Sequence, residues 1–168
     1  MALTPAGYRL IQTCEGCRLS AYPDPASGGA PWTIGYGHTG PEVHPGLVIS
    51  QAQADSWLRS DVTRFEAAVD RCLTASASQN PLHHSQPNPQ PTLRLSPQQR
   101  DALVSFCFNV GAAAFGGSTL VRRLKAGEAA STVLAQELPR WVHGPNGPMP
   151  GLVNRRQAEL RHAQGVTA

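Results

Sequence analysis

The sequence has 168 residues, 40% of them hydrophobic and 15% charged, with a formal net charge of +3 at pH 7. This length suits one domain, or two lobes that share a core, and the composition is that of a chain that folds alone. The basic excess is small, and its only clusters are short pairs at Arg122-Arg123 and Arg155-Arg156. Isolated pairs of this kind are typical of solvated helix faces, so we expect no nucleic-acid partner.

The N-terminal segment has neither the charged start nor the continuous apolar run of a secretory signal. No segment has the length and apolarity of a membrane span. We therefore expect a protein that is made in a cytoplasm without a signal peptide and needs another route to any target outside that compartment.

Four cysteines are present, at positions 14, 17, 72 and 107, and a reducing cytoplasm predicts that they are thiols. Cys14 and Cys17 have the Cys-x-x-Cys spacing, which supplies two metal ligands at most, and no second pair of ligands follows at a suitable spacing. The sequence therefore predicts no metal site and no cofactor, and we interpret Cys14 and Cys17 as small core residues. A metal or redox protein remains an alternative, which bound zinc or a redox-sensitive thiol titration would reveal.

The first predicted helix starts at Thr4-Pro5, where Thr4 is the N-cap and proline takes the first helical position, and it ends at Gly16. Glu15 therefore lies at the C-terminal end of a short helix, where the helix dipole disfavours a negative charge. A carboxylate is tolerated there mainly where something else requires it.

The stretch from Leu19 to Thr39 is dense in glycine, proline and aromatic residues. This composition predicts turns around short antiparallel strands, and Trp32–Tyr36 is the best strand candidate. Ser50 then begins a capping box, and apolar residues recur behind it at helical spacing, which predicts one long helix over 51–73.

Residues 75–92 are rich in serine, glutamine, asparagine and proline and show no apolar period. We expect an exposed or partly disordered insert, in which His83 and His84 are surface residues.

The rest of the chain is predicted to be helical. Ser96-Pro97 starts a helix that Gly111 ends, and further helices follow over 119–126, 128–138 and 152–163. The fold class is therefore α+β and mainly helical, with a small antiparallel sheet near the N-terminus and a long connecting helix. The predicted parts of this single domain are an N-terminal lobe over 1–50, the connecting helix over 51–73, the polar insert over 75–92 and a helical lobe over 96–165.

Three polar residues around the glycine-rich stretch, Glu15, Asp24 and Thr33, follow the spacing E-x8-D-x8-T. A helix end that leads into a tight β structure can bring two carboxyl groups to opposite walls of one cleft, as glycoside hydrolysis requires. One acid then protonates the leaving oxygen, and the other acts from the far side, on a water or on the sugar. Acids at this spacing also occur by chance, so the neighbouring sequence decides the interpretation.

The neighbouring motifs occur in order along nearly the whole chain, outside the insert at 75–92. They are Glu15-Gly16-x-Arg18-Leu19, Ala21-Tyr22, Trp32 to Thr39, Asp101 to Gly111, Ser118-Thr119-Leu120, Arg140-Trp141 and Gly151 to Arg156. Together they resemble the T4-type phage lysozyme family, glycoside hydrolase family 24. The resemblance implies a lysozyme-like fold of two lobes joined by a long helix, with the cleft between them.

The resemblance also implies an activity, that of endolysins of phages and prophages, which cleave the β-1,4 bond between N-acetylmuramic acid and N-acetylglucosamine in peptidoglycan. By this resemblance Glu15 is the general acid, and we expect the helix end and partial burial to favour its protonated form. Asp24 is then the carboxylate that activates water or stabilises the transition state, and Thr33 is the hydroxyl that holds the water. A water held in this way favours inversion at the anomeric carbon.

One departure from the family concerns the hairpin. The family commonly has five residues between the aspartate and the threonine, whereas eight separate Asp24 from Thr33, and the extra ones fall in the turn over 27–31. A longer hairpin tip leaves the two side chains free to face each other, so we keep both assignments. The alternative for Asp24 is a turn former before a proline.

Two further residues are candidates for a supporting role near the site. We expect His38 to tie the sheet to the long helix through Asp61, and a general base is the alternative. Arg155 either pairs with Glu15 and orients it or lies on the surface of a helix.

Phe108, Asn109 and Thr119 match family positions near the cleft, where aromatic and polar side chains suit sugar rings and N-acetyl groups. A core position is the alternative for Phe108. The partner that the resemblance implies is peptidoglycan, and the mild positive charge favours adsorption to an anionic cell wall.

The missing signal and the expected target together imply a release step. We expect a monomer that acts on the cell wall in the periplasm after a holin has permeabilised the membrane. The alternative function is a non-catalytic peptidoglycan-binding phage protein on the same fold, and the presence of Glu15, Asp24 and Thr33 argues against it.

Overall fold

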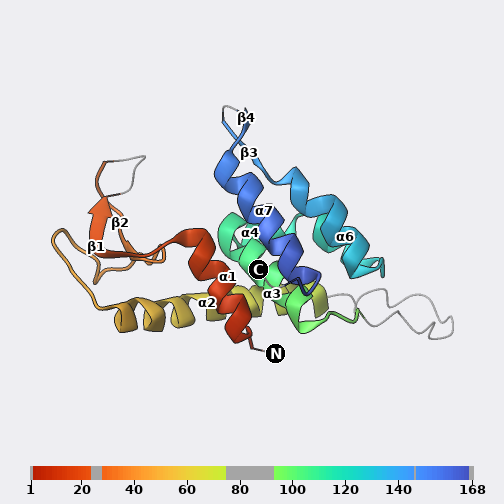
Figure 1. The fold of residues 1–168 in the computed structure, drawn as a ribbon, viewed down its shortest axis with the longest axis horizontal. Coiled ribbons are helices and arrows are strands. Elements are labelled where there is room, and N and C mark those ends of the chain that lie inside the picture. Colours follow the sequence, from red (N-terminus) through yellow and green to blue (C-terminus); the bar gives the residue numbers. More distant parts are fainter. Residues whose placement is uncertain (1, 24–27, 75–92, 146, 167–168) are drawn as a thin grey trace, which may run out of the picture. The chain divides into compact units, whose positions relative to one another are not determined.

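The structure is a computed structural model that describes residues 2–23, 28–74, 93–145 and 147–166 (Figure 1). The chain forms two compact units: Tyr8–Arg64, here called the sheet unit, and Met1–Gly7 with Phe65–Ala168, here called the helical unit. The polar insert predicted over 75–92, with its two histidines, lies outside the described residues.

Helix α1 (Pro5–Glu15) begins and ends where the sequence predicts. The Gly7 amide donates to the Thr4 hydroxyl over 3.1 Å, so Thr4 is the N-cap. Gly16 ends the helix because its backbone turns into the left-handed region, with φ at +69°. Glu15 is therefore the last helical residue.

The first residues of the chain group with the helical unit, whereas the sequence placed them in the N-terminal lobe. The cause is Asp101, whose buried carboxylate accepts hydrogen bonds from both the amide (3.1 Å) and the hydroxyl of Thr4. Gly7 allows the close approach, since a Cβ at this position would lie 2.6 Å from the Asp101 Cγ.

The sheet of the sheet unit is one antiparallel pair, β1 (Arg18–Pro23) and β2 (Trp32–Gly35). In its register Tyr22 pairs with Thr33, and Pro23 pairs with Trp32. The predicted strand is thus confirmed, and its partner is the segment directly after α1. The buried apolar side chains of this unit include Ile11 on α1, Ile34 on β2, and Leu58 and Val62 on the next helix.

Helix α2 (Gln51–Thr74) is one continuous helix of 24 residues, as predicted. Ser50 caps it by accepting from the Gln53 amide over 3.2 Å. Its residues belong to the sheet unit as far as Arg64 and to the helical unit from Phe65. Neither α2 nor any other helix in the described part of the chain combines the length and apolarity that crossing a membrane needs.

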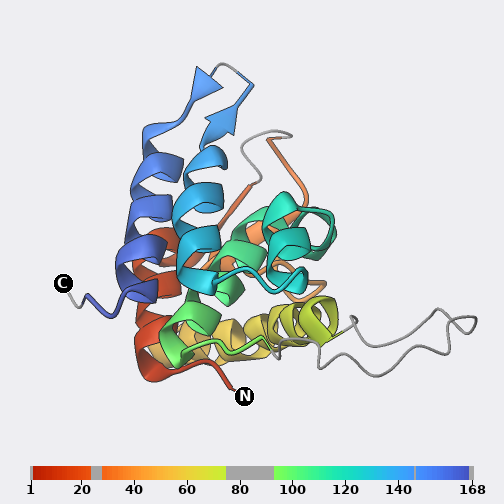
Figure 2. The ribbon, with the colours of Figure 1, turned by 90° about the vertical axis from the view of Figure 1, so that its right-hand side faces the viewer.

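The helical unit consists of short helices around α3. Helices α6 and α7 lie side by side (Figure 2), and α3 packs most extensively against α7. The predicted helices over 119–126, 128–138 and 152–163 are all present, and each of their boundaries lies within two residues of the predicted one. The elements are α3 (Pro97–Val110), α4 (Ala112–Gly116), α5 (Thr119–Lys125), α6 (Ala130–Glu137), a 3-10 turn (Leu138–Arg140), β3 (His143–Gly144), β4 (Gly147–Pro148) and α7 (Pro150–Ala163).

Helix α3 is the core of this unit, with every residue from Arg100 to Cys107 buried. Ser96 and Gln99 form the capping box at its start, each side chain accepting from the other's amide, and Gly111 ends the helix as predicted. A helix buried on all sides must place its polar side chains against partners, since an unpaired buried charge is costly. Asp101 meets this requirement at Thr4 and at His162, whose Nε2 lies 3.0 Å from the carboxylate.

Candidate active site

Glu15 stands at the junction of α1 and the sheet, and its side chain is exposed. The expectation of partial burial is therefore wrong.

The chain leaves the helix at Gly16, and this turn also takes Cys17 away from the apolar face of α1. Cys17 is exposed rather than a core residue, whereas Cys14 is half-buried.

Thr33 is half-buried on β2, directly opposite Tyr22 in the sheet register. Asp24, the second predicted carboxylate, follows Pro23 at the end of β1 and lies outside the described residues. Glu15 and Thr33 thus belong to the same unit. Glu15 lies at the end of α1, and Thr33 lies on β2, which pairs with β1, the strand that follows α1.

A third carboxylate, Asp55 on α2, holds this junction together, and the sequence did not single it out. Its Oδ1 accepts hydrogen bonds from Gln12 Nε2 (3.0 Å), from the Tyr36 hydroxyl (3.1 Å) and from Gln51 Nε2 (3.0 Å). Burial and the bond to Asp55 raise the pKa of Tyr36, which therefore stays a neutral donor. Because Gln12 lies one helical turn before Glu15, this network connects the end of α1 to the segment after β2 and to α2.

His38 lies between two carboxylates and against an indole ring. Its Nδ1 is 2.7 Å from Asp61 Oδ2, its Nε2 is 2.6 Å from Glu42 Oε1, and its ring stacks on Trp57 with centroids 4.4 Å apart. The predicted link from His38 to Asp61 is confirmed. Burial lowers the pKa of His38, but the hydrogen bonds to Glu42 and Asp61 and their charges outweigh this effect, so the pKa is raised overall. Since both ring nitrogens face carboxylates, the geometry favours the structural role over that of a general base.

The three predicted substrate contacts, Phe108, Asn109 and Thr119, all lie in the helical unit and are half-buried. Phe108 packs on Phe65 with ring centroids 5.0 Å apart, so part of its ring contributes to packing. The Oδ1 of Asn109 accepts a hydrogen bond from Arg156.

Arg155 and Arg156 are buried, with only 6% and 1% of their surfaces exposed, so the expectation of a solvated pair is wrong here. The reason is Glu159, a fully buried carboxylate one turn later on α7. It accepts from Arg155 Nε (3.2 Å), Arg156 Nη1 (2.6 Å) and the Ser105 hydroxyl (2.8 Å). The spacing R-R-x-x-E in the sequence was the signal for this network, because residues three and four apart face each other on a helix.

Burial raises the pKa of Glu159, and the two guanidiniums act in the opposite direction, as does Ser105. Such a group is held in place only while its partners remain, since removing one partner of a buried ion pair costs about 3–5 kcal/mol. The pairing of Arg155 with Glu15 stays a prediction.

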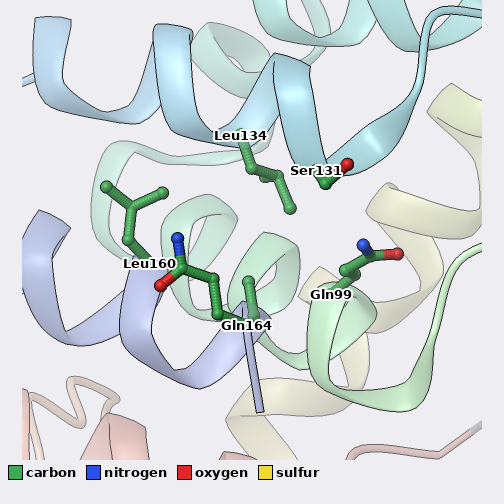
Figure 3. A pocket seen from close by; sticks show the side chains of 6 residues that line it. Gln99, Ser131, Leu134, Leu160 and Gln164 are labelled. Atoms are coloured by element: carbon green, nitrogen blue, oxygen red, sulfur yellow. The ribbon is translucent and has the colours of Figure 1, made fainter. Parts of the chain in front are cut away.

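A cavity of about 290 Å³ lies within the helical unit, between α3, α6 and α7 (Figure 3). No charged side chain lines it, and none of the predicted site residues does, so it is not the place of glycosidic chemistry. Its lining residues are Gln99, Ser131, Leu134, Leu160, Ala163 and Gln164.

Within the described ranges, no group of three or more His, Cys, Asp or Glu side chains could hold a metal ion. Cys107 is buried in α3, and burial raises the pKa of its thiol to about 12. This thiol therefore stays protonated near neutrality, and a protonated thiol is a poor nucleophile and metal ligand.

Comparison with known proteins gives a consistent result along the chain. A family model described as phage lysozyme matches residues 12–159. The endolysin of Acyrthosiphon pisum secondary endosymbiont phage 1 is 36% identical over 163 residues, which cover 95% of each protein. The endolysin of Bacillus phage PZA is 39% identical over 95% of this chain, but the match covers 54% of that protein, so this chain spans about half of its length.

Solved structures agree over nearly the full length of the chain. The muramidase domain of SpmX from Asticaccaulis excentricus superposes with a TM-score of 0.77 at 32% identity and covers 96% of this chain and 97% of that one. The endolysin from Escherichia coli O157:H7 phage FAHEc1 superposes with a TM-score of 0.78 at 28% identity, covering 99% of this chain and 96% of that one. The lysozyme-like α+β fold predicted from the sequence is confirmed.

The cluster around His38 predicts a pH-dependent contribution to stability. Because the pKa of folded His38 is raised above its ordinary value of 6.5, its bonds to the carboxylates stabilise the fold fully below that value. This stabilisation is lost as the pH rises through the raised pKa. The difference in unfolding free energy between wild type and Asp61→Asn should therefore be larger at about pH 6 than at about pH 9 in urea denaturation. In a His38→Gln background the pH dependence should vanish, and a difference that is constant between the two pH values would contradict the account.

Proposed function

The chain belongs to the phage lysozyme family, and we propose that it is an endolysin: a glycoside hydrolase that cleaves the β-1,4 bond between N-acetylmuramic acid and N-acetylglucosamine in peptidoglycan. The observation that carries this proposal is the position of Glu15, exposed on the last turn of α1 where the chain turns into the sheet. The end-to-end similarity to an endolysin and to a muramidase domain supports it. The alternative of a non-catalytic binding protein is not favoured, because a pure binder has no need for Glu15, Asp24 and Thr33.

Glu15 acts as the general acid in this proposal and donates its proton to the glycosidic oxygen. The Asp55 network, through Gln12, restrains the helical turn that carries Glu15. A general acid must be held within hydrogen-bond reach of the leaving oxygen, so this restraint is of direct use.

Asp24 and Thr33 act on the opposite side of the scissile bond. The Asp24 carboxylate removes a proton from water or stabilises the oxocarbenium-like transition state, and the Thr33 hydroxyl orients the water. Thr33 lies on β2, opposite Tyr22 of β1, and β1 ends at Pro23, directly before Asp24. This proximity along the paired strands supports the division of roles. A positioned water as nucleophile makes the reaction inverting.

The glycan is proposed to contact Phe108, Asn109 and Thr119, and the protein is proposed to act as a monomer on the cell wall in the periplasm. By the resemblance to phage endolysins, we propose that a separate holin gives it access to the wall.

The assignment of Glu15 predicts the outcome of a conservative substitution. Glu15→Gln keeps the size of the side chain but removes the proton donor, so the clearing of outer-membrane-permeabilised cells should fall by about 100- to 10,000-fold. Glu128→Gln, which changes another exposed glutamate in the same way, should clear cells at the wild-type rate. If Glu15→Gln clears as fast as wild type, Glu15 is not the acid.

The assignment of a water nucleophile predicts the anomer that is formed first. Cleavage of a β-linked glycan with inversion should release the α-anomer of the new reducing end, observed by proton NMR before mutarotation. The β-anomer as first product would mean retention and would contradict a water held by Thr33 as the attacking group.

The proposed holin predicts the behaviour of the protein expressed alone. Cells that accumulate it in the cytoplasm should keep a constant optical density until chloroform permeabilises the membrane, and should then lyse rapidly. Rapid lysis before chloroform is added would show that no partner is needed.

A further inference from the structure

Arg18 places a cation on the face of the sheet that carries the Thr33 side chain. Tyr22 and Thr33 are partners in the register of β1 and β2, and the side chains of directly opposed residues lie on the same face of a sheet. The guanidinium carbon of Arg18 lies 4.6 Å from the centroid of the Tyr22 ring. The guanidinium is therefore on the same side of the sheet as the hydroxyl that is proposed to hold the water.

The contact with the ring, rather than the strand register, fixes the place of Arg18. Arg18 pairs with Gly35, whereas Tyr22 pairs with Thr33, so the step from 18 to 22 on β1 corresponds to the shorter step from 33 to 35 on β2. Alternation of side chains along such an irregular pair does not assign a face to Arg18. The cation–π contact with Tyr22 assigns it directly.

The Arg18 guanidinium is held by the ring and keeps its hydrogen-bond donors available. Tyr22 is half-buried and Arg18 is exposed, so the ring is the anchored partner and the cation is the accessible one. A guanidinium carries five N–H donors in its plane, and no described residue accepts a hydrogen bond from Arg18. A planar fork of free donors suits a carboxylate, which accepts two parallel hydrogen bonds.

The proposed substrate carries its carboxylates on one of its two sugars. The bond to be cleaved starts from the reacting carbon of N-acetylmuramic acid, and the same sugar carries a lactyl ether. The carboxyl of this ether is either free or extended by a peptide stem that has carboxylates of its own, whereas N-acetylglucosamine carries no acid group. A cation on the face that carries Thr33 therefore distinguishes the sugar that is attacked from its neutral neighbour.

We propose that Arg18 is a specificity-determining residue that binds a carboxylate on the lactyl group of N-acetylmuramic acid or on its peptide stem, and so sets which of the two alternating β-1,4 bonds is cleaved. Tyr22 is the positioning residue that holds the cation, and a cation held in advance loses less side-chain entropy on binding. This inference rests on the proposed function and deepens it, because it names the charged group that the site selects.

Three soluble glycan substrates test the role of the charge. The first carries peptide stems, the second has lost its stems to an amidase and has free lactyl carboxylates, and the third is the second with these carboxylates converted to methylamides. Wild type should have a kcat/KM on the neutral third substrate that is about tenfold or more below that on the better charged one. The charged substrate that is cleaved faster identifies the source of the carboxylate, the stem for the first and the lactyl group for the second.

Substitution of Arg18 tests whether this residue recognises the charge. Arg18→Gln removes the cation and keeps a polar side chain, so the ratio of kcat/KM on the better charged substrate to that on the neutral one should fall by about tenfold. The control is Arg9→Gln, the same change at an exposed arginine of α1 in the same unit, which should keep the wild-type ratio. An equal fall in both variants would mean that the net charge of the protein attracts the substrate, and would overturn the inference.

The role of Tyr22 is tested by a pair of substitutions. Tyr22→Leu removes the ring but leaves the charge of Arg18, so the ratio should fall several-fold, whereas Tyr22→Phe keeps the ring and should keep the ratio. Thermal unfolding shows whether Tyr22→Leu is folded at the assay temperature. Arg18→Lys, which keeps the charge but lacks the planar fork, gives a second measurement and should also lose several-fold of the ratio. A wild-type ratio in Arg18→Lys and in a folded Tyr22→Leu would overturn the held fork.

The outcomes separate this inference from the proposed function. If wild type cleaves none of the three substrates, the proposed function fails. If wild type cleaves all three with equal kcat/KM, or if Arg18→Gln keeps the wild-type ratio, only the present inference is overturned.

Discussion

A buried carboxylate must be surrounded by hydrogen-bond donors, and this requirement organises the helical unit of the protein. In the helical unit Asp101 and Glu159 are almost completely buried. Thr4, which donates to Asp101, and Ser105, which donates to Glu159, are far away from them in the sequence, whereas the two arginines that bind Glu159 lie within about one turn of it on α7. Thr4 binds Asp101 and thereby draws the N-terminal residues into this unit. Glu159 receives two arginines and a serine. Removal of one arginine from such a buried ion pair costs about 3–5 kcal/mol, and the hydrogen bonds from Thr4 and Ser105 tie together segments that are far apart in the sequence.

In the sheet unit a half-buried carboxylate, Asp55, has a similar set of donors near the proposed catalytic acid. Asp55 gathers donors from α1, from the residue after β2 and from α2, and so restrains the helical turn before Glu15. Glu15 itself has to be exposed, because its proton must reach a bond of a polymeric substrate. Rigid surroundings with an exposed acid at the end of a helix are the arrangement that general acid catalysis needs.

The parts that depend on local chemistry were predictable from the sequence. Ser96 and Gly16 set the ends of helices through contacts within a few residues, and such signals are contained in the sequence itself. Burial depends on which side chains the fold brings together, and there the predictions were less successful. Arg156 was expected on a solvated face because the compensating Glu159 was not considered, and Cys17 was expected in the core. Asp55 was missed because its partners are not contiguous in the sequence, so the network that supports the acid had no motif.

The central claim is that this chain hydrolyses the bond on the reducing side of N-acetylmuramic acid. Digestion of purified peptidoglycan, followed by mass analysis of the soluble products, tests this claim most directly. The account predicts fragments that end in a reducing N-acetylmuramic acid and have gained one water for each bond cleaved. Fragments that end in reducing N-acetylglucosamine, or in an anhydro sugar formed without water, would contradict it.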